Sequence, residues 1–112
     1  MRAKKRRRES VANNDLINTI RLKLRVKPQA AKVIAAMVSE PGRFFPTNDI
    51  LDVIGYVSTD SREWTVTSAS RVVGEARSAL RDWQIRAQIV TLQKTGYVMT
   101  DESAKAVLDF IA

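Results

Sequence analysis

The clearest hydrophobic pattern in the chain lies between residues 68 and 83 and has the period of a helix. At about 100° per residue, one face collects the apolar residues Ala69, Val72, Val73, Ala76, Leu80 and Trp83. The opposite side and its shoulders carry Ser70, Arg71, Gly74, Glu75, Arg77, Ser78 and Arg81. This side suits a DNA groove, because serine lets a helix approach and arginine reaches phosphates or guanine edges. The alternative is an ordinary amphipathic surface helix.

Gly74 stands in the middle of this expected helix, where glycine costs about 1 kcal/mol relative to alanine. Close approach of its backbone to DNA or to another helix would offset that cost. Downstream, two β-rich segments, Ile89–Leu92 and Tyr97–Met99, flank a four-residue turn and predict a hairpin. We expect Gly96 to supply a positive φ in the turn. Lys94 at the tip either meets a phosphate or a minor groove, or is simply solvated.

Upstream of this helix and hairpin, the hydrophobic pattern predicts one strand and two helices. Ile20–Lys27 alternates strictly between aliphatic and basic residues, as a half-buried strand does. Its basic face either adds to an electrostatic footprint or protects a sheet edge. Helices are expected over residues 28–39 and 48–55, the first begun by proline and the second closed by glycine. Asp49 and Asp52 fit the start and the solvated side of the second helix better than a catalytic pair.

The remaining segments predict core plugs, a loop and a last helix. Phe44 and Phe45 are expected in the core between helices, and residues 56–66 form a polar loop. Trp64 in that loop either tucks into the core or anchors a partner. A final helix begins near Thr100, with an apolar face of Ala104, Val107, Leu108 and Ile111. This face either packs back on the domain or pairs with a second copy as a homodimer.

The order of these motifs resembles the winged helix-turn-helix effector domain of two-component response regulators, the OmpR/PhoB class, over about residues 26–99. The likeness rests on the turn Pro41-Gly42-Arg43, on the helix that ends at Gly55, on Leu80-Arg81, on Ile89-x-Thr91-Leu92 and on Gly96-Tyr97. It implies an α+β fold with a three-helix core and a C-terminal hairpin wing. Two departures from the family are expected: its larger N-terminal sheet is reduced here to one strand, and the last helix lies beyond the usual family ending. The resemblance also implies that the loop 56–66 could touch RNA polymerase.

The resemblance assigns roles position by position. Arg77 falls on a DNA-contacting arginine of the recognition helix, and Gly74 and Glu75 fall where members often carry contact residues. Gln93 falls on a wing position often held by arginine, and Lys94 replaces the first of two wing glycines. The complete expected DNA-binding set is Ser68, Ser70, Arg71, Gly74, Glu75, Arg77, Ser78, Arg81, Gln93, Lys94, Thr95, Lys4, Lys5, Arg6, Arg7 and Arg8.

Charge is concentrated at one end of the 112-residue chain. The first ten residues hold six basic and one acidic side chain, so they contribute +5 of the net charge of +7. We expect residues 1–14 to be a disordered basic arm and residues 15–112 to be one domain. A basic tail on a near-neutral body favours a polyanionic partner, although such a tail can also serve only solubility.

Composition argues against several classes of protein. Histidine and cysteine are both absent, which removes the commonest general base, metal ligands and thiol nucleophile. We therefore expect no enzyme, no metal and no cofactor. The sequence contains no run of 18 apolar residues that could form a membrane span. We therefore expect a cytoplasmic, nucleoid-associated protein.

Three functions fit the sequence. The first is a sequence-specific regulator of transcription, without a receiver domain, that binds double-stranded DNA. Its helix 68–83 would enter the major groove, and its wing 89–99 and basic arm would lie on the backbone or in the minor groove. The second is an architectural DNA-binding protein of low specificity. The third is a winged-helix module that binds an acidic protein partner.

Overall fold

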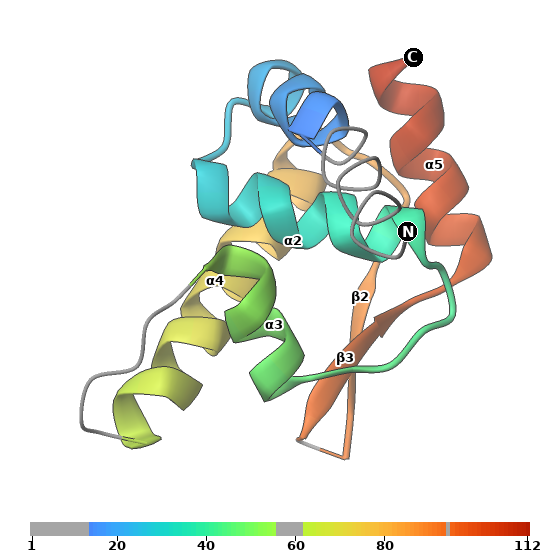
Figure 1. The fold of residues 1–112 in the computed structure, drawn as a ribbon. Helices are drawn as coiled ribbons and strands as arrows, with labels where there is room; N and C mark the ends of the chain where they lie inside the picture. Colours follow the sequence, from blue (N-terminus) through green and yellow to red (C-terminus); the bar gives the residue numbers. More distant parts are fainter. Residues whose placement is uncertain (1–13, 56–61, 94) are drawn as a thin grey trace, which may run out of the picture.

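The computed structural model describes residues 14–55, 62–93 and 95–112, with the side chains of the fourth helix described from Ser68 onward. It shows an α+β fold in which a small antiparallel sheet lies beside a group of helices (Figure 1). Residues 14–24 are helical. The elements that follow are α2 (Pro28–Ser39), β1 (Phe45–Pro46), α3 (Thr47–Ile54), α4 (Arg62–Asp82), β2 (Ile89–Leu92), β3 (Gly96–Met99) and α5 (Asp101–Ile111).

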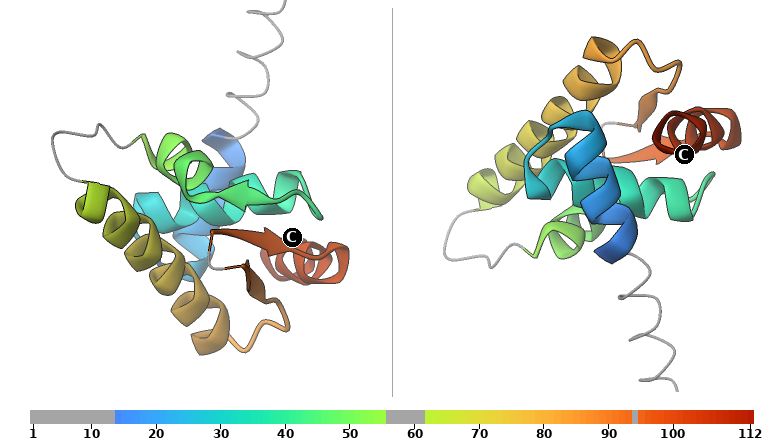
Figure 2. Two further views of the ribbon diagram at one scale, coloured as in Figure 1. Left: turned by 90° about the horizontal axis from the view of Figure 1, so that it is seen from below. Right: turned by 90° about the horizontal axis from the view of Figure 1, so that it is seen from above.

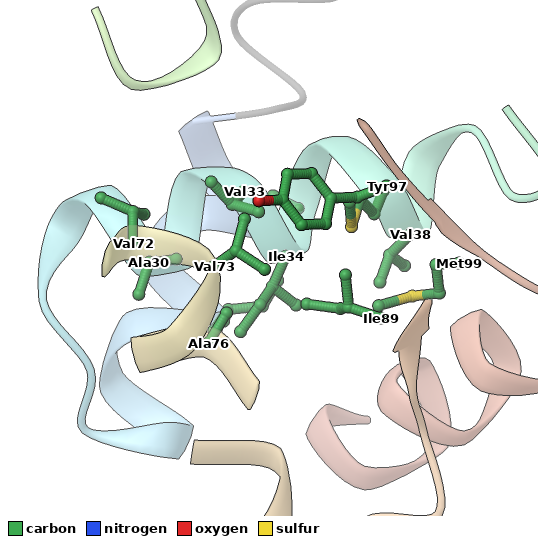
Figure 3. Packing of buried hydrophobic residues seen from close by; sticks show 14 of the residues in the cluster. Ala30, Val33, Ile34, Val38, Val72, Val73, Ala76, Ile89, Tyr97 and Met99 are labelled. Carbon is green, nitrogen blue, oxygen red and sulfur yellow. The ribbon is translucent and has the colours of Figure 1, made fainter. Parts of the chain in front are cut away.

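Helix α2 forms the centre of the core. Its sequence is rich in alanine and aliphatic residues, and seven of its twelve side chains are buried. It begins with Pro28 at the first helical turn, as predicted. Helices α4 and α5 flank it, as both views of Figure 2 show. In Figure 3, Val33 and Ile34 of α2 meet Val73 of α4 and Ile89 of β2, so one apolar cluster joins helices and sheet.

The predicted hairpin is confirmed, and it gains a third strand. β2 pairs with β3 from Ile89 opposite Met99 to Leu92 opposite Gly96. β3 also pairs with the short β1, so the strand order is β1-β3-β2 and β2 lies at an edge. The expectation for Gly96 is wrong: its φ is not positive, and among the described residues of the turn Gln93 is the left-handed one, with φ 52°. Glycine is needed at 96 for space: a Cβ there would lie 2.6 Å from the carbonyl oxygen of Phe45.

The predicted N-terminal strand is wrong, because residues 14–24 form a helix instead. Ile20 and Leu24 are buried four residues apart on one side of this helix, and Leu22 on the other side is 70% exposed. Leu16 and Ile17 extend the buried side by another turn. The alternation was therefore coincidental: the leucine, lysine and arginine residues of this segment all rank high in helix propensity. Arg25 ends the helix in the left-handed conformation, with φ 55°.

Helix α4 extends further toward the N-terminus than predicted. It begins at Arg62, so the second half of the expected loop 56–66 is helical, and residues 56–61 lie outside the described part. Trp64 lies among the α4 residues whose side chains are not described. At its other end the helix stops at Asp82, because Gln84 turns into the left-handed conformation with φ 56°.

Two aromatic side chains expected in the core are half exposed. Trp83 lies just beyond the end of α4 and is 40% exposed. Its indole nitrogen donates a hydrogen bond to the carbonyl of Leu24 at 2.8 Å, and its ring lies 5.6 Å from that of Phe110. Phe44 is also 40% exposed and lies against Gly96, whereas Phe45 is 1% exposed and does fill the core.

The last helix packs back on the domain. Thr100 caps α5 by accepting a hydrogen bond from the backbone nitrogen of Ser103 at 3.2 Å, as expected. The apolar face that could have formed a dimer is largely used inside the domain, because Ala104, Val107 and Ile111 are buried against α2 and its neighbours. Leu108, at the flank of this face, remains 42% exposed. None of the helices in the described part is long and apolar enough to cross a membrane.

Candidate nucleic-acid interface

The two faces predicted for the helix over residues 68–83 are present in α4. Ala69, Val73 and Ala76 are fully buried, and Leu80 is 1% exposed. The outward side carries the expected contact residues: Ser70, Arg71, Arg77 and Arg81 are exposed, and Ser68, Gly74, Glu75 and Ser78 are half-buried. The aliphatic side thus anchors the helix, and the arginine and serine side faces away from the core.

Gly74 lies at the centre of the outward side. A Cβ built at this position would have no heavy atom within 4 Å, apart from the backbone of its own helix and adjacent residues. Of the two explanations considered for this glycine, close approach of another helix therefore fails. Within the described residues, nothing in the fold requires glycine here, and alanine would form a better helix.

Arg77, expected to contact DNA, is committed to the sheet. Its Nε and Nη2 donate hydrogen bonds to the carbonyl oxygen of Ile89 at 3.0 and 2.6 Å, and Nη2 also donates to Thr91 Oγ1 at 2.6 Å. The guanidinium carbon lies 5.7 Å from the centre of the Tyr97 ring. Arg77 therefore fastens α4 to the edge strand β2 and sets the angle between helix and hairpin. Its Nη1 makes no hydrogen bond to another described residue.

The other two expected arginines of α4 are not held in internal ion pairs. No hydrogen bond or ion pair links Arg71 to another described residue, and Arg81 makes only a long hydrogen bond, 3.5 Å, to Ser78 Oγ. In the described part of the chain the ion pairs are those of Arg43 with Glu40 and Asp49. The hydrogen bond that Arg43 donates to the Glu40 carboxylate raises the pKa of Arg43, partial burial opposes this, and Asp49 adds to the rise.

A groove lies between the C-terminal part of α4, the segment that follows it, β2 and the start of α5. We call it the arginine groove, because Arg77, Arg81 and Arg86 line it together with Gln84 and Gln88. Its volume is about 1,010 Å³, and its remaining lining comes from Ile85, Ala87, Ile89, Val90, Thr100, Glu102 and Ser103. Sequence reasoning missed Arg86, which follows the helix in a segment without a recognised motif. The available signal was the repeated occurrence of arginine and glutamine between residues 81 and 88, at Arg81, Gln84, Arg86 and Gln88.

The opposite side of α4 has a mixed charge. Here a shallower hollow of about 590 Å³ lies between α4 and the residues after the N-terminal helix. Arg25 and Lys27 line it from one side, and Glu75 and Asp82 from the other, with Gly74 and Ser78 also in its lining. Glu75, an expected contact residue, therefore lies on the acidic flank of the helix and away from the arginine groove.

The hairpin turn is fastened to the start of α3. The carbonyl oxygen of Thr95 accepts hydrogen bonds from the backbone nitrogen of Thr47 at 3.1 Å and from its Oγ1 at 3.3 Å. Gln93 and Thr95 are exposed in the turn. Lys94 and the basic arm, with the expected contacts Lys4, Lys5, Arg6, Arg7 and Arg8, lie outside the described residues.

No group of three or more acidic side chains that could hold a metal ion occurs in the described part of the chain.

Comparison with known proteins finds no relative. The chain matches no protein-family model, no curated protein and no solved structure.

Proposed function

We propose that the protein is a transcription regulator that binds duplex DNA through a winged helix-turn-helix domain. Helices α3 and α4 would be the helix-turn-helix, α4 the recognition helix, and the β2–β3 hairpin the wing. The element order from α2 to β3, with β1 placed beside β3, is compatible with such a domain. The anchored hairpin turn supports this arrangement, because a wing needs a defined position beside its helix.

The observation that carries the proposal is the outward side of α4. Gly74 leaves open space at its centre, and the exposed Arg71 and Arg81 lie one helical turn or two away. A cationic helix side without a side chain at its centre fits a major groove about 12 Å wide. The helix backbone at Gly74 can come close to base edges while the arginines reach bases or phosphates. The same side would be poorly suited to an apolar protein partner.

The primary test is selection of bound duplexes from a random pool at two salt concentrations. We expect enrichment of one sequence with an affinity at least about a thousandfold above that for random DNA. A ratio near one would identify an architectural protein of low specificity. Absence of duplex binding even at low salt would contradict DNA binding and leave the protein-interaction module.

Two substitutions at Gly74 connect binding to the surface proposed. Gly74→Gln places a long neutral side chain on the open centre of the helix, and Gly74→Ala adds one methyl group. Both residues favour helix over glycine, so neither variant should lose thermal stability. We expect Gly74→Gln to weaken binding to the selected duplex at least tenfold and Gly74→Ala to weaken it less. Wild-type affinity in a folded Gly74→Gln variant would show that α4 does not enter the groove.

A further inference from the structure

We propose that the arginine groove seats the phosphate backbone of one strand of the bound duplex, with Arg81 and Arg86 as phosphate contacts. This inference rests on the proposed function, because it names the path of the DNA beside α4. Arg77 has a different role in it: as a positioning residue, it holds β2 against α4 and thereby shapes the groove.

Charge is the first argument. Three arginines line the groove, and Glu102 is the one acidic residue among its described lining residues. No ion pair in the described part of the chain involves any of the three arginines. Like charges that converge without counter-ions repel one another, and a phosphate strand relieves that repulsion while releasing its own condensed cations.

Position is the second argument. Arg81 belongs both to the outward side of α4 and to the groove, so the two surfaces are continuous. Seven residues separate Gly74 from Arg81, which corresponds to about 10 Å along a helix. Half of a major groove about 12 Å wide is about 6 Å, so a strand bounding a duplex centred on Gly74 passes between Gly74 and Arg81, on the side where Arg81 and Arg86 line the groove.

The two flanks of α4 differ in charge, and the difference favours the flank that carries the arginine groove. In the hollow on the other flank, Arg25 and Lys27 are opposed by Glu75 and Asp82. The arginine groove also offers the side-chain amides of Gln84 and Gln88, which can donate to phosphate oxygens. A backbone strand is therefore favoured on the hairpin flank.

The test compares Arg86→Ala and Arg81→Ala with a matched control, Lys105→Ala. Lys105 is exposed on α5 but does not line the groove, and its removal changes the net charge equally. Affinity for the selected duplex and for a scrambled one is measured by fluorescence anisotropy at several salt concentrations. For each arginine variant we expect weaker binding to both duplexes and a salt slope lower by about 0.9. The control should keep the wild-type slope.

A second measurement locates the strand. Methylphosphonate groups, which carry no charge, replace single phosphates of the selected duplex one at a time. We expect a position at which the wild type loses affinity and Arg86→Ala loses none further, because the contact is already absent. If wild type binds DNA but Arg86→Ala and Arg81→Ala match the control, the strand path is wrong and the proposed function stands. If the arginine variants lose affinity only for the selected duplex, the proposed strand path is also wrong, since such a loss indicates that these arginines contact bases. If wild type binds no duplex, both proposals fall.

Discussion

The hydrogen bonds of Arg77 lead to the most specific prediction about stability. Arg77→Ala removes two donors from the carbonyl oxygen of Ile89 and one from Thr91 Oγ1, at distances of 2.6–3.0 Å. It also removes the cation beside the Tyr97 ring. Because β2 is the edge strand, no other strand in the described part of the chain pairs on its outer side. The substitution therefore loosens the connection between α4 and the hairpin.

The expected magnitude follows from the charge and the exposure of the group. Hydrogen bonds from a charged donor contribute about 1.5–3 kcal/mol when buried. Arg77 is exposed overall, so solvent competes for these bonds and we expect a total loss of about 1–2 kcal/mol in the free energy of unfolding. In a domain of this size, that lowers the melting temperature by roughly 5–10 °C. Arg77→Lys should recover less than half, because one ammonium group cannot reproduce the paired donors.

Urea unfolding monitored by circular dichroism measures this loss directly. The matched control is Arg71→Ala, because Arg71 is on the same helix and has no hydrogen bond or ion pair to another described residue. We expect its free energy of unfolding to stay within about 0.5 kcal/mol of wild type. Equal unfolding midpoints for the two variants would refute the role of Arg77 in fastening helix to hairpin.

Substitutions at three further positions test the fold. Gly96→Ala places a Cβ 2.6 Å from the Phe45 carbonyl, and we expect a loss of about 1–3 kcal/mol in urea unfolding; wild-type stability would contradict the close packing. Thr100→Ala removes the cap of α5 and should cost about 1 kcal/mol, whereas Thr100→Ser should cost less. Trp83→Phe removes the 2.8 Å hydrogen bond to Leu24, with an expected loss of about 1 kcal/mol in thermal unfolding; an unchanged melting temperature would count against that bond.

The sequence predicted those elements whose signals are local. The stripe from Ala69 to Leu80 repeats over three helical turns, and it is buried as expected. The hairpin followed from two β-rich segments around a short turn, and the cap at Thr100 needs only the residues beside it. Such signals depend on backbone preferences and on side-chain periodicity, which are present before the chain folds.

Where a local pattern was compatible with two structures, tertiary packing determined which one forms. Ile20–Lys27 has the period of a strand, but Ile20 and Leu24 are also four residues apart, and a helix buries both against the core. Gly96 was read as a conformational glycine, although it is required because Phe44 and Phe45 lie against it. In both cases the deciding neighbours come from distant parts of the chain.

The candidate interface shows the same division. By itself the sequence determined that α4 has an aliphatic side and an arginine and serine side, because helical periodicity alone separates them. Only the tertiary structure decided what each arginine can do. Arg77 lies within reach of Ile89, and Arg86 joins Arg81 around one groove, because the chain turns after α4 and brings β2 back alongside it. Contacts between segments depend on that turn, and no periodicity within one segment encodes them.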